Sequence, residues 1–184
     1  VAKDFHFSGT AYFRATDTDS FNGDGSVFEE CIGDPGNEYL CDRIGSSGEV
    51  PILDQAGGFA SAGFDAINNI SRRDQESYGG SLQTILAKEI GINENQFIFG
   101  GSFDRGTSRF ESQVELSQLT DDRGTIRTGL FVPEEEVEIK TRTETWSLYF
   151  WDTFYFSEAM NISVSGRYNN SNVLIRDITG NTPD

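Results

Sequence analysis

The residues of this chain that are able to perform catalysis are few and scattered. His6 is the only histidine, and no Ser or Cys stands in a Gly-x-Ser-x-Gly turn or beside a usable base. Asp104 and Asp152 are candidates for a pair of acids, but two carboxylates held in a polar network are the more ordinary interpretation. We therefore predict that the chain is not an enzyme and has no catalytic residues.

Metal-binding patterns are equally weak. The segment 17–25 resembles a calcium loop in composition, but Phe21 stands at its fifth position and Phe28 where the bidentate Glu belongs. At most a weak, adventitious Ca²⁺ site remains. Cys31 and Cys41 have no His or third Cys near them, which argues against zinc. We predict no bound metal and no cofactor.

The two cysteines lie in a strongly acidic part of the chain. Segment 17–70 contains eleven Asp or Glu and a single base, Arg43, and the whole chain carries a formal charge of −16. Nucleic acid is an unsuitable partner, because phosphate binding needs patches of Lys and Arg. We predict a local Cys31–Cys41 disulfide that closes a surface loop, which implies an oxidising compartment. The alternative is two unrelated thiols.

The pattern that must position all these residues is an alternation of apolar and polar side chains. One face of segment 161–168 consists of Ile162, Val164, Gly166 and Tyr168. A period of two is typical of a β-strand, because successive side chains point to opposite sides. The same pattern predicts five antiparallel strands, near residues 4–15, 74–90, 96–112, 140–156 and 161–176.

The connections between these strands alternate in length. Short turns are predicted at 91–95 and 157–160, and long loops at 16–72 and 114–138. Long outward loops and short inward turns are typical of outer-membrane barrels, whereas a long structureless loop is unusual in a compact soluble domain. Each strand also has the roughly 9–11 residues that a tilted strand needs to cross a bilayer. The prediction is an all-β fold, made of antiparallel strands of a transmembrane β-barrel.

Several stretches along the strands form a series of motifs. They are Gly9-Thr10-Ala11-Tyr12-Phe13-Arg14, residues 71–83, residues 101–110, residues 147–154 and residues 165–169. In this order they resemble the TonB-dependent outer-membrane receptors, in particular siderophore-receptor-like members. Asp152 and Gly166-Arg167-Tyr168 are the most family-like features, and the acidic loop with paired cysteines resembles one of the family's extracellular loops.

This resemblance implies about five consecutive strands from the first half of a 22-strand barrel. Residues 1–184 are then a partial barrel domain, without the family's plug domain, its TonB-contacting box or the remaining strands. The implied function is energised uptake of a scarce ligand, such as a ferric siderophore, across the bacterial outer membrane. The implied partners are outer-membrane lipid, the rest of the barrel and plug, and the TonB complex; the ligand itself stays unassigned.

Polar residues in the predicted strands are expected to point into the barrel lumen, because a charge on the lipid face costs roughly 2–4 kcal/mol near the bilayer midplane. The predicted lumen-facing residues are Arg14, Gln83, Asp104, Asp152 and Arg167. In the last hairpin, facing residues should have numbers that sum to about 317. That register would put Asp152 one diagonal step from Arg167, on the same face.

A second function class fits part of the sequence. A secreted, soluble all-β binding module with acidic, calcium-dependent loops would account for the charge, the disulfide and the alternation. It does not account for the aromatic residues on the outer faces or for the length of the first loop. A soluble module should purify without detergent, and a piece of a barrel should not.

Overall fold

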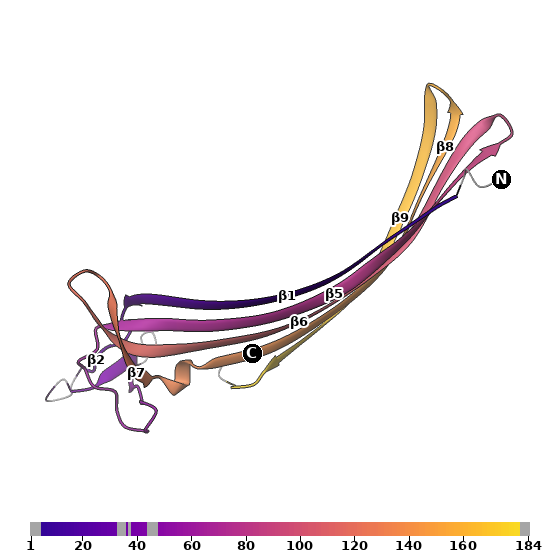
Figure 1. Cartoon of the computed structure of the whole chain (residues 1–184). Coiled ribbons are helices and arrows are strands. Elements are labelled where there is room, and N and C mark those ends of the chain that lie inside the picture. The colour runs from indigo at the N-terminus through magenta and orange to yellow at the C-terminus, as the bar shows by residue number, and fades with distance from the viewer. Residues whose placement is uncertain (1–4, 33–35, 37, 44–47, 181–184) are drawn as a thin grey trace. The chain divides into compact units, whose positions relative to one another are not determined.

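The computed structural model describes residues 5–32, 36, 38–43 and 48–180. Strands make up 78% of it, which establishes an all-β fold with antiparallel sheets. Five long strands lie side by side in the order β1-β5-β6-β8-β9 (Figure 1). Their bounds are Phe5–Gly25 (β1), Ala66–Ile90 (β5), Asn93–Leu119 (β6), Val137–Ser157 (β8) and Met160–Asp177 (β9). A shorter strand, β7 (Thr125–Phe131), pairs with β6, and a 3-10 turn, η1, covers Pro133–Glu135.

The chain forms two compact units. Among the described residues, unit 1 contains 5–16, 75–108 and 141–175, and unit 2 contains the others. The five long strands contribute residues to both units. Within the described residues β1 and β9 are the edges of the long sheet, and no closed barrel forms.

The five predicted strands and both short turns are confirmed, but the strands are longer than predicted. The first residue of the predicted strand 4–15 lies outside the described residues. Strand β1 continues to Gly25 and β5 begins at Ala66, so the connection between them covers 26–65 rather than 16–72. Strand β6 likewise extends to Leu119, into the predicted loop 114–138. Polar sequence does not end these strands, because backbone hydrogen bonds hold a ladder whatever the side chains are.

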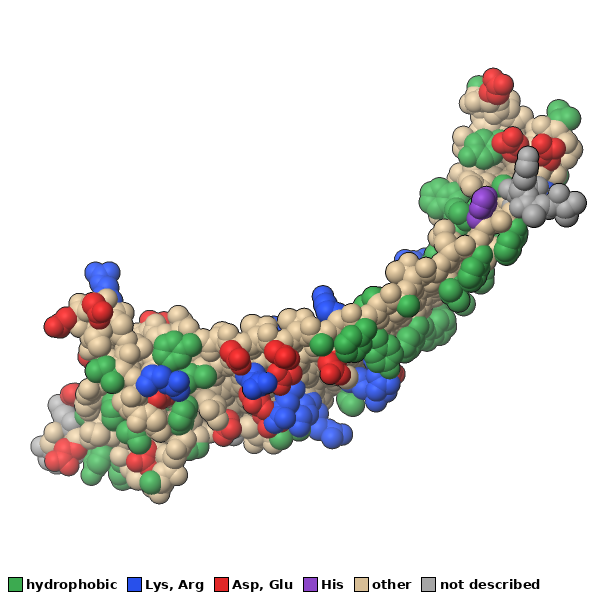
Figure 2. Space-filling model, viewed as in Figure 1, with side chains coloured by type: hydrophobic (Ala, Val, Ile, Leu, Met, Phe, Trp, Pro, Cys, Tyr) green, Lys and Arg blue, Asp and Glu red, His purple; other side chains and the backbone are tan. Residues whose placement is uncertain are grey.

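Unit 1 has one face that is mostly apolar, here named the apolar face. Its rings touch across strands: the centroids of Tyr78 and Phe103 are 6.4 Å apart, and those of Trp146 and Tyr168 are 5.3 Å apart. Because side chains alternate along a strand, these contacts assign the neighbouring apolar positions to the same face. They include Phe97 and Phe99 on β6, Leu148 and Phe150 on β8, and Ile162 and Val164 on β9. Figure 2 shows hydrophobic side chains gathered along the strands.

In unit 2, the connection between β1 and β5 folds into a small structure of its own. Three short strands, β2 (Glu29–Glu30), β3 (Leu40–Arg43) and β4 (Glu49–Pro51), form an antiparallel sheet. Its buried apolar residues share one core with residues of the long strands. That core consists of Phe28, Leu40, Ile52, Ala60, Ile67, Val114, Leu116 and Val132, with Phe64 packed against it. The predicted loop is therefore a folded layer attached to β5 and β6.

The predicted disulfide is confirmed. Cys31 and Cys41 are bonded, with their Cα atoms 5.1 Å apart, and both residues are buried. The bond joins the residue that follows β2 to the second residue of β3. It thus closes the connection between these two strands.

Replacing both cysteines with Ser should lower the free energy of unfolding of this layer by about 2–3 kcal/mol, because the bond closes a loop of about ten residues. Limited proteolysis of residues 26–65 under non-reducing conditions measures the effect as faster cleavage. The control is the unmodified chain treated with a reductant, which should behave like the double variant. Equal cleavage rates for oxidised and substituted protein would contradict the prediction.

Glu115 is the centre of a buried polar network in unit 2. Its carboxylate accepts hydrogen bonds from Asn68 Nδ2 (3.1 Å), Arg127 Nε (3.1 Å) and the backbone N–H of Gly129 (2.6 Å). Burial alone raises the pKa of this carboxyl group, but the three donors more than offset that effect, so the pKa lies below its ordinary value of 4.5. Gly129 has a φ of +76°, a conformation that glycine adopts without strain. The network fastens β7 to β5 and β6.

Glu115→Ala should lower the free energy of unfolding by about 1–3 kcal/mol, because it leaves the amide of the buried Asn68 without its acceptor and removes the carboxylate that Arg127 and the Gly129 N–H bind. Since the folded pKa of Glu115 is depressed, its contribution is present above pH 4.5 and is lost as the pH falls through the folded pKa. Chemical denaturation at pH 7 and at pH 3 measures both effects. The matched control is Glu111→Gln, whose carboxylate pairs with Arg109 at the surface and should cost less than about 1 kcal/mol. Equal losses for the two variants would contradict the prediction.

Candidate functional site

The face of unit 1 opposite the apolar face carries hydrogen-bonded polar side chains, and we name it the polar face. Tyr12 on β1 donates from its hydroxyl to Asp104 Oδ1 on β6, at 2.8 Å, across the intervening strand β5. The tyrosine side chain can pass over β5 because the residue beneath it is Gly79. A Cβ at that position would be 2.5 Å from Asp104 Oδ1 and 2.8 Å from the Tyr12 ring. The glycine thus makes room for a bond between two strands that are not neighbours.

A second tyrosine crosses a strand in the opposite direction. Tyr149 on β8 donates from its hydroxyl to Gln83 Oε1 on β5, at 3.0 Å. The strand between them is β6, and a Cβ on its Gly100 would lie 2.4 Å from the Tyr149 hydroxyl. Two tyrosine–glycine crossings therefore connect four of the five long strands at the polar face.

Arg167 on β9 extends this network. Its Nε donates to Asn169 Oδ1 at 2.8 Å, and one terminal nitrogen donates to Ser147 Oγ at 3.2 Å. The guanidinium also lies over the Tyr149 ring, 5.9 Å from its centroid. Ser147 is buried, and its hydroxyl oxygen is 2.8 Å from Ser102 Oγ on β6. The polar face can offer hydroxyl, amide, carboxylate and guanidinium groups to a polar ligand.

Asp152 does not lie beside Arg167. The Oγ atoms of Thr153 and Ser163 are 3.0 Å apart, so facing residues of β8 and β9 sum to 316 rather than the predicted 317. A shift of one residue exchanges the two faces of a strand. Asp152 therefore shares the apolar face, where it accepts a hydrogen bond from Asn95 Nδ2 at 2.8 Å. The prediction that it points to the same side as Arg167 is wrong.

Four of the five predicted polar residues belong to the polar face. The contacts above put Gln83, Asp104 and Arg167 there, and the alternation along β1 puts Arg14 on the same face as Tyr12. Because Asp104 and Asp152 lie on opposite faces, they cannot act as a pair of acids.

The two tyrosines were missed by the sequence analysis. Paired glycines inside predicted strands, Gly79-Gly80 and Gly100-Gly101, were the available signal, since glycine in a strand often marks a close approach.

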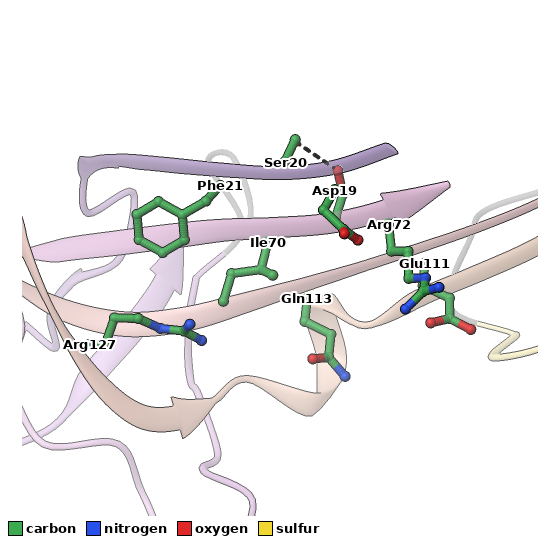
Figure 3. Close-up of a pocket in the computed structure, with 9 residues that line it drawn as sticks. Asp19, Ser20, Phe21, Ile70, Arg72, Glu111, Gln113 and Arg127 are labelled. Carbon is green, nitrogen blue, oxygen red and sulfur yellow. Dashed lines mark hydrogen bonds between the residues drawn. The ribbon is translucent and has the colours of Figure 1, made fainter. Parts of the chain in front are cut away.

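Unit 2 contains a hollow of about 400 Å³, shown in Figure 3. The guanidinium of Arg127 lies over the ring of Phe21, 5.6 Å from its centroid, and its Nε is 3.1 Å from Glu115 Oε2. Arg72 pairs with Asp74 at 3.1 Å, and this hydrogen bond raises the pKa of the arginine further. The remaining lining residues are Asp19, Ser20, Ile70, Ser71, Glu111 and Gln113. Both cations of this hollow are already neutralised by carboxylates, so it is not an anion site.

The segment 17–25 lies inside strand β1, and extended backbone of this kind does not wrap around an ion as a calcium loop does. Among the residues that the structure describes, no three His, Cys, Asp or Glu side chains gather in a way suited to a metal ion.

The residues that the structure describes include no helix with the length and apolar character to cross a bilayer. Comparison of the chain with protein-family models, curated proteins and solved structures found no match.

Gly79→Ala should lower the free energy of unfolding by about 1–3 kcal/mol, since the added methyl group overlaps both Asp104 and the Phe103 carbonyl oxygen. The matched control is Gly106→Ala on β6, where the nearest atoms would be 3.8 Å from the new methyl group. Denaturant titration of both variants in the same medium measures the difference. Equal stabilities would contradict the proposed role of Gly79 in the crossing.

Proposed function

We propose that this chain forms part of the wall of a β-barrel in the bacterial outer membrane, within a TonB-dependent receptor that takes up a scarce ligand. The observation that carries the proposal is the apolar face of unit 1. Its side chains stay in contact with solvent in the isolated sheet: Phe13 is 69% exposed and Val164 58% exposed. Exposed apolar side chains spread over five neighbouring strands require a covering, and lipid is the covering that the resemblance suggests.

The lengths of the strands support the same conclusion. Unit 1 contains residues 5–16 of β1 and residues 160–175 of β9, each at least as long as the roughly 9–11 residues of a tilted membrane-spanning strand. The edges β1 and β9 have unpaired backbone groups, which lipid cannot satisfy. Further strands must therefore pair with them in a membrane, and the family resemblance sets the expected total at 22.

The two faces divide the roles within the proposed barrel. The polar face, with Tyr12, Gln83, Asp104 and Arg167, lines the lumen, and the folded layer closed by the disulfide lies on the extracellular side. The short turns at 91–92 and 158–159 face the periplasm, as the alternation of loop lengths suggests. Transport requires a plug and the TonB complex. The expected cargo class, a ferric siderophore or a similar chelate, rests on the family resemblance alone.

The proposal is tested by labelling two adjacent residues of β9. Val164→Cys belongs to the apolar face and Ser165→Cys to the polar face, so the pair is internally matched. A spin label at 164 should be quenched by lipid-soluble oxygen, and a label at 165 by a water-soluble nickel chelate, in the full gene product in vesicles. Cys31 and Cys41 do not interfere, since they are bonded to each other.

The soluble-module alternative gives a different pattern. Neither label would respond to the lipid-soluble quencher more than to the chelate, and the protein would purify as a monomer without detergent. That result would overturn the membrane assignment, and with it the uptake function.

A further inference from the structure

The apolar face of unit 1 contains a hollow of about 720 Å³, a volume within the range of small-molecule sites. Its floor is formed by Gly80 and Gly101, which have no side chains to fill it. Its walls are apolar side chains of β5, β6 and β8: Leu82, Phe99, Phe103, Trp146 and Leu148. The exposed lining is mostly apolar, so its natural occupant is a hydrocarbon chain rather than a polar solute.

A basic cluster follows the hollow along the same face. Arg105 is two residues beyond Phe103 on β6, and Glu144 is two residues before Trp146 on β8. Because residues two apart on a strand share a face, Arg105 and Glu144 are the next residues of the apolar face beside the hollow. Arg105 donates to Glu144 at 3.0 Å, and Arg142 donates to the same carboxylate from Nε at 3.2 Å. Two guanidiniums thus share one carboxylate, and these three side chains together carry a charge of +1.

The guanidiniums are available to a ligand. The side chain of Arg105 is 31% exposed and that of Arg142 is 46% exposed. A guanidinium has five N–H donors, and the contacts with Glu144 occupy only some of them. Donors of this kind bind phosphate oxygens strongly, because charge-assisted hydrogen bonds are about twice as strong as neutral ones.

We propose that the hollow binds one acyl chain of an anionic phospholipid, with the lipid phosphate held by Arg105 and Arg142. The inference rests on the proposed membrane function and adds to it a lipid of defined chemistry. An apolar groove with a net positive end complements an amphiphile that has a negative head. The acyl chain of a zwitterionic lipid would fit the groove, but its headgroup, which has no net charge, would not balance the positive charge of the two guanidiniums.

The test uses the full gene product, delipidated in detergent and then titrated with phosphatidylglycerol or phosphatidylcholine, with native mass spectrometry as the readout. The protein should retain phosphatidylglycerol in preference to phosphatidylcholine. The double variant Arg105→Gln/Arg142→Gln should reduce that preference by about tenfold or more, because it removes the charge-assisted hydrogen bonds. Arg176→Gln on β9, with the same loss of charge per residue, should leave the preference unchanged.

A second variant tests the groove separately from the charge. Ala11→Leu adds bulk beside the glycine floor and should weaken binding of both lipids, with the preference for phosphatidylglycerol retained. Equal retention of the two lipids by the unmodified protein would overturn the inference, and so would a protein dimer that covers this face and excludes lipid.

The labelling of residues 164 and 165 separates this failure from a failure of the proposed function. If oxygen quenches the label at 164 and the chelate quenches the label at 165, but the protein does not prefer phosphatidylglycerol, only the lipid site is rejected. An aqueous pattern at both positions rejects both proposals.

Discussion

The strict alternation of side chains along the strands of unit 1 is the constraint on which the rest of the structure depends. Each strand has one set of residues for an apolar environment and one for a polar environment, and a shift by one residue would exchange the two sets. The hydrogen-bonded ladder tolerates such a shift, whereas the side chains do not. Register is therefore set by the contacts of particular side chains on both faces, and these contacts are where the strands are most sensitive to change.

On the polar face, the tyrosine–glycine crossings supply such contacts over a longer distance than a neighbouring pair can. Tyr12 reaches Asp104 and Tyr149 reaches Gln83, each across a whole strand. A slip of either outer strand would carry the phenol away from its glycine and into a side chain. One hydrogen bond that passes over a glycine thus holds three strands in register. Without it, a separate polar pair would be needed at each of the two strand interfaces.

The sequence was sufficient to predict the strands, the short turns and the disulfide, because periodicity and turn chemistry are local properties. It was not sufficient for the face of Asp152. The predicted sum of 317 assumed a symmetrical turn, and the side-chain contacts of β8 and β9 correspond to 316. Nor was the network around Glu115 accessible, because Asn68, Glu115 and Gly129 come from three strands and no short pattern connects them. The ends of β1, β5 and β6 were also missed. Their polar stretches were assigned to loops, because the alternation of apolar residues was the only signal used for strands.

The shared core of unit 2 has a consequence for how the chain can evolve. Phe28, Leu40 and Ile52 belong to the connection between β1 and β5, yet they are buried together with Ile67 and Leu116 of the long strands. Substitutions in an ordinary surface loop are nearly neutral, but here a change at one of these positions is also a change in the interior of the fold. Diversification is left to exposed positions such as Ile32 and Val50, whose side chains point away from that interior. A lineage under pressure to alter its outer surface would therefore keep the framework of this layer and vary only its outward side chains.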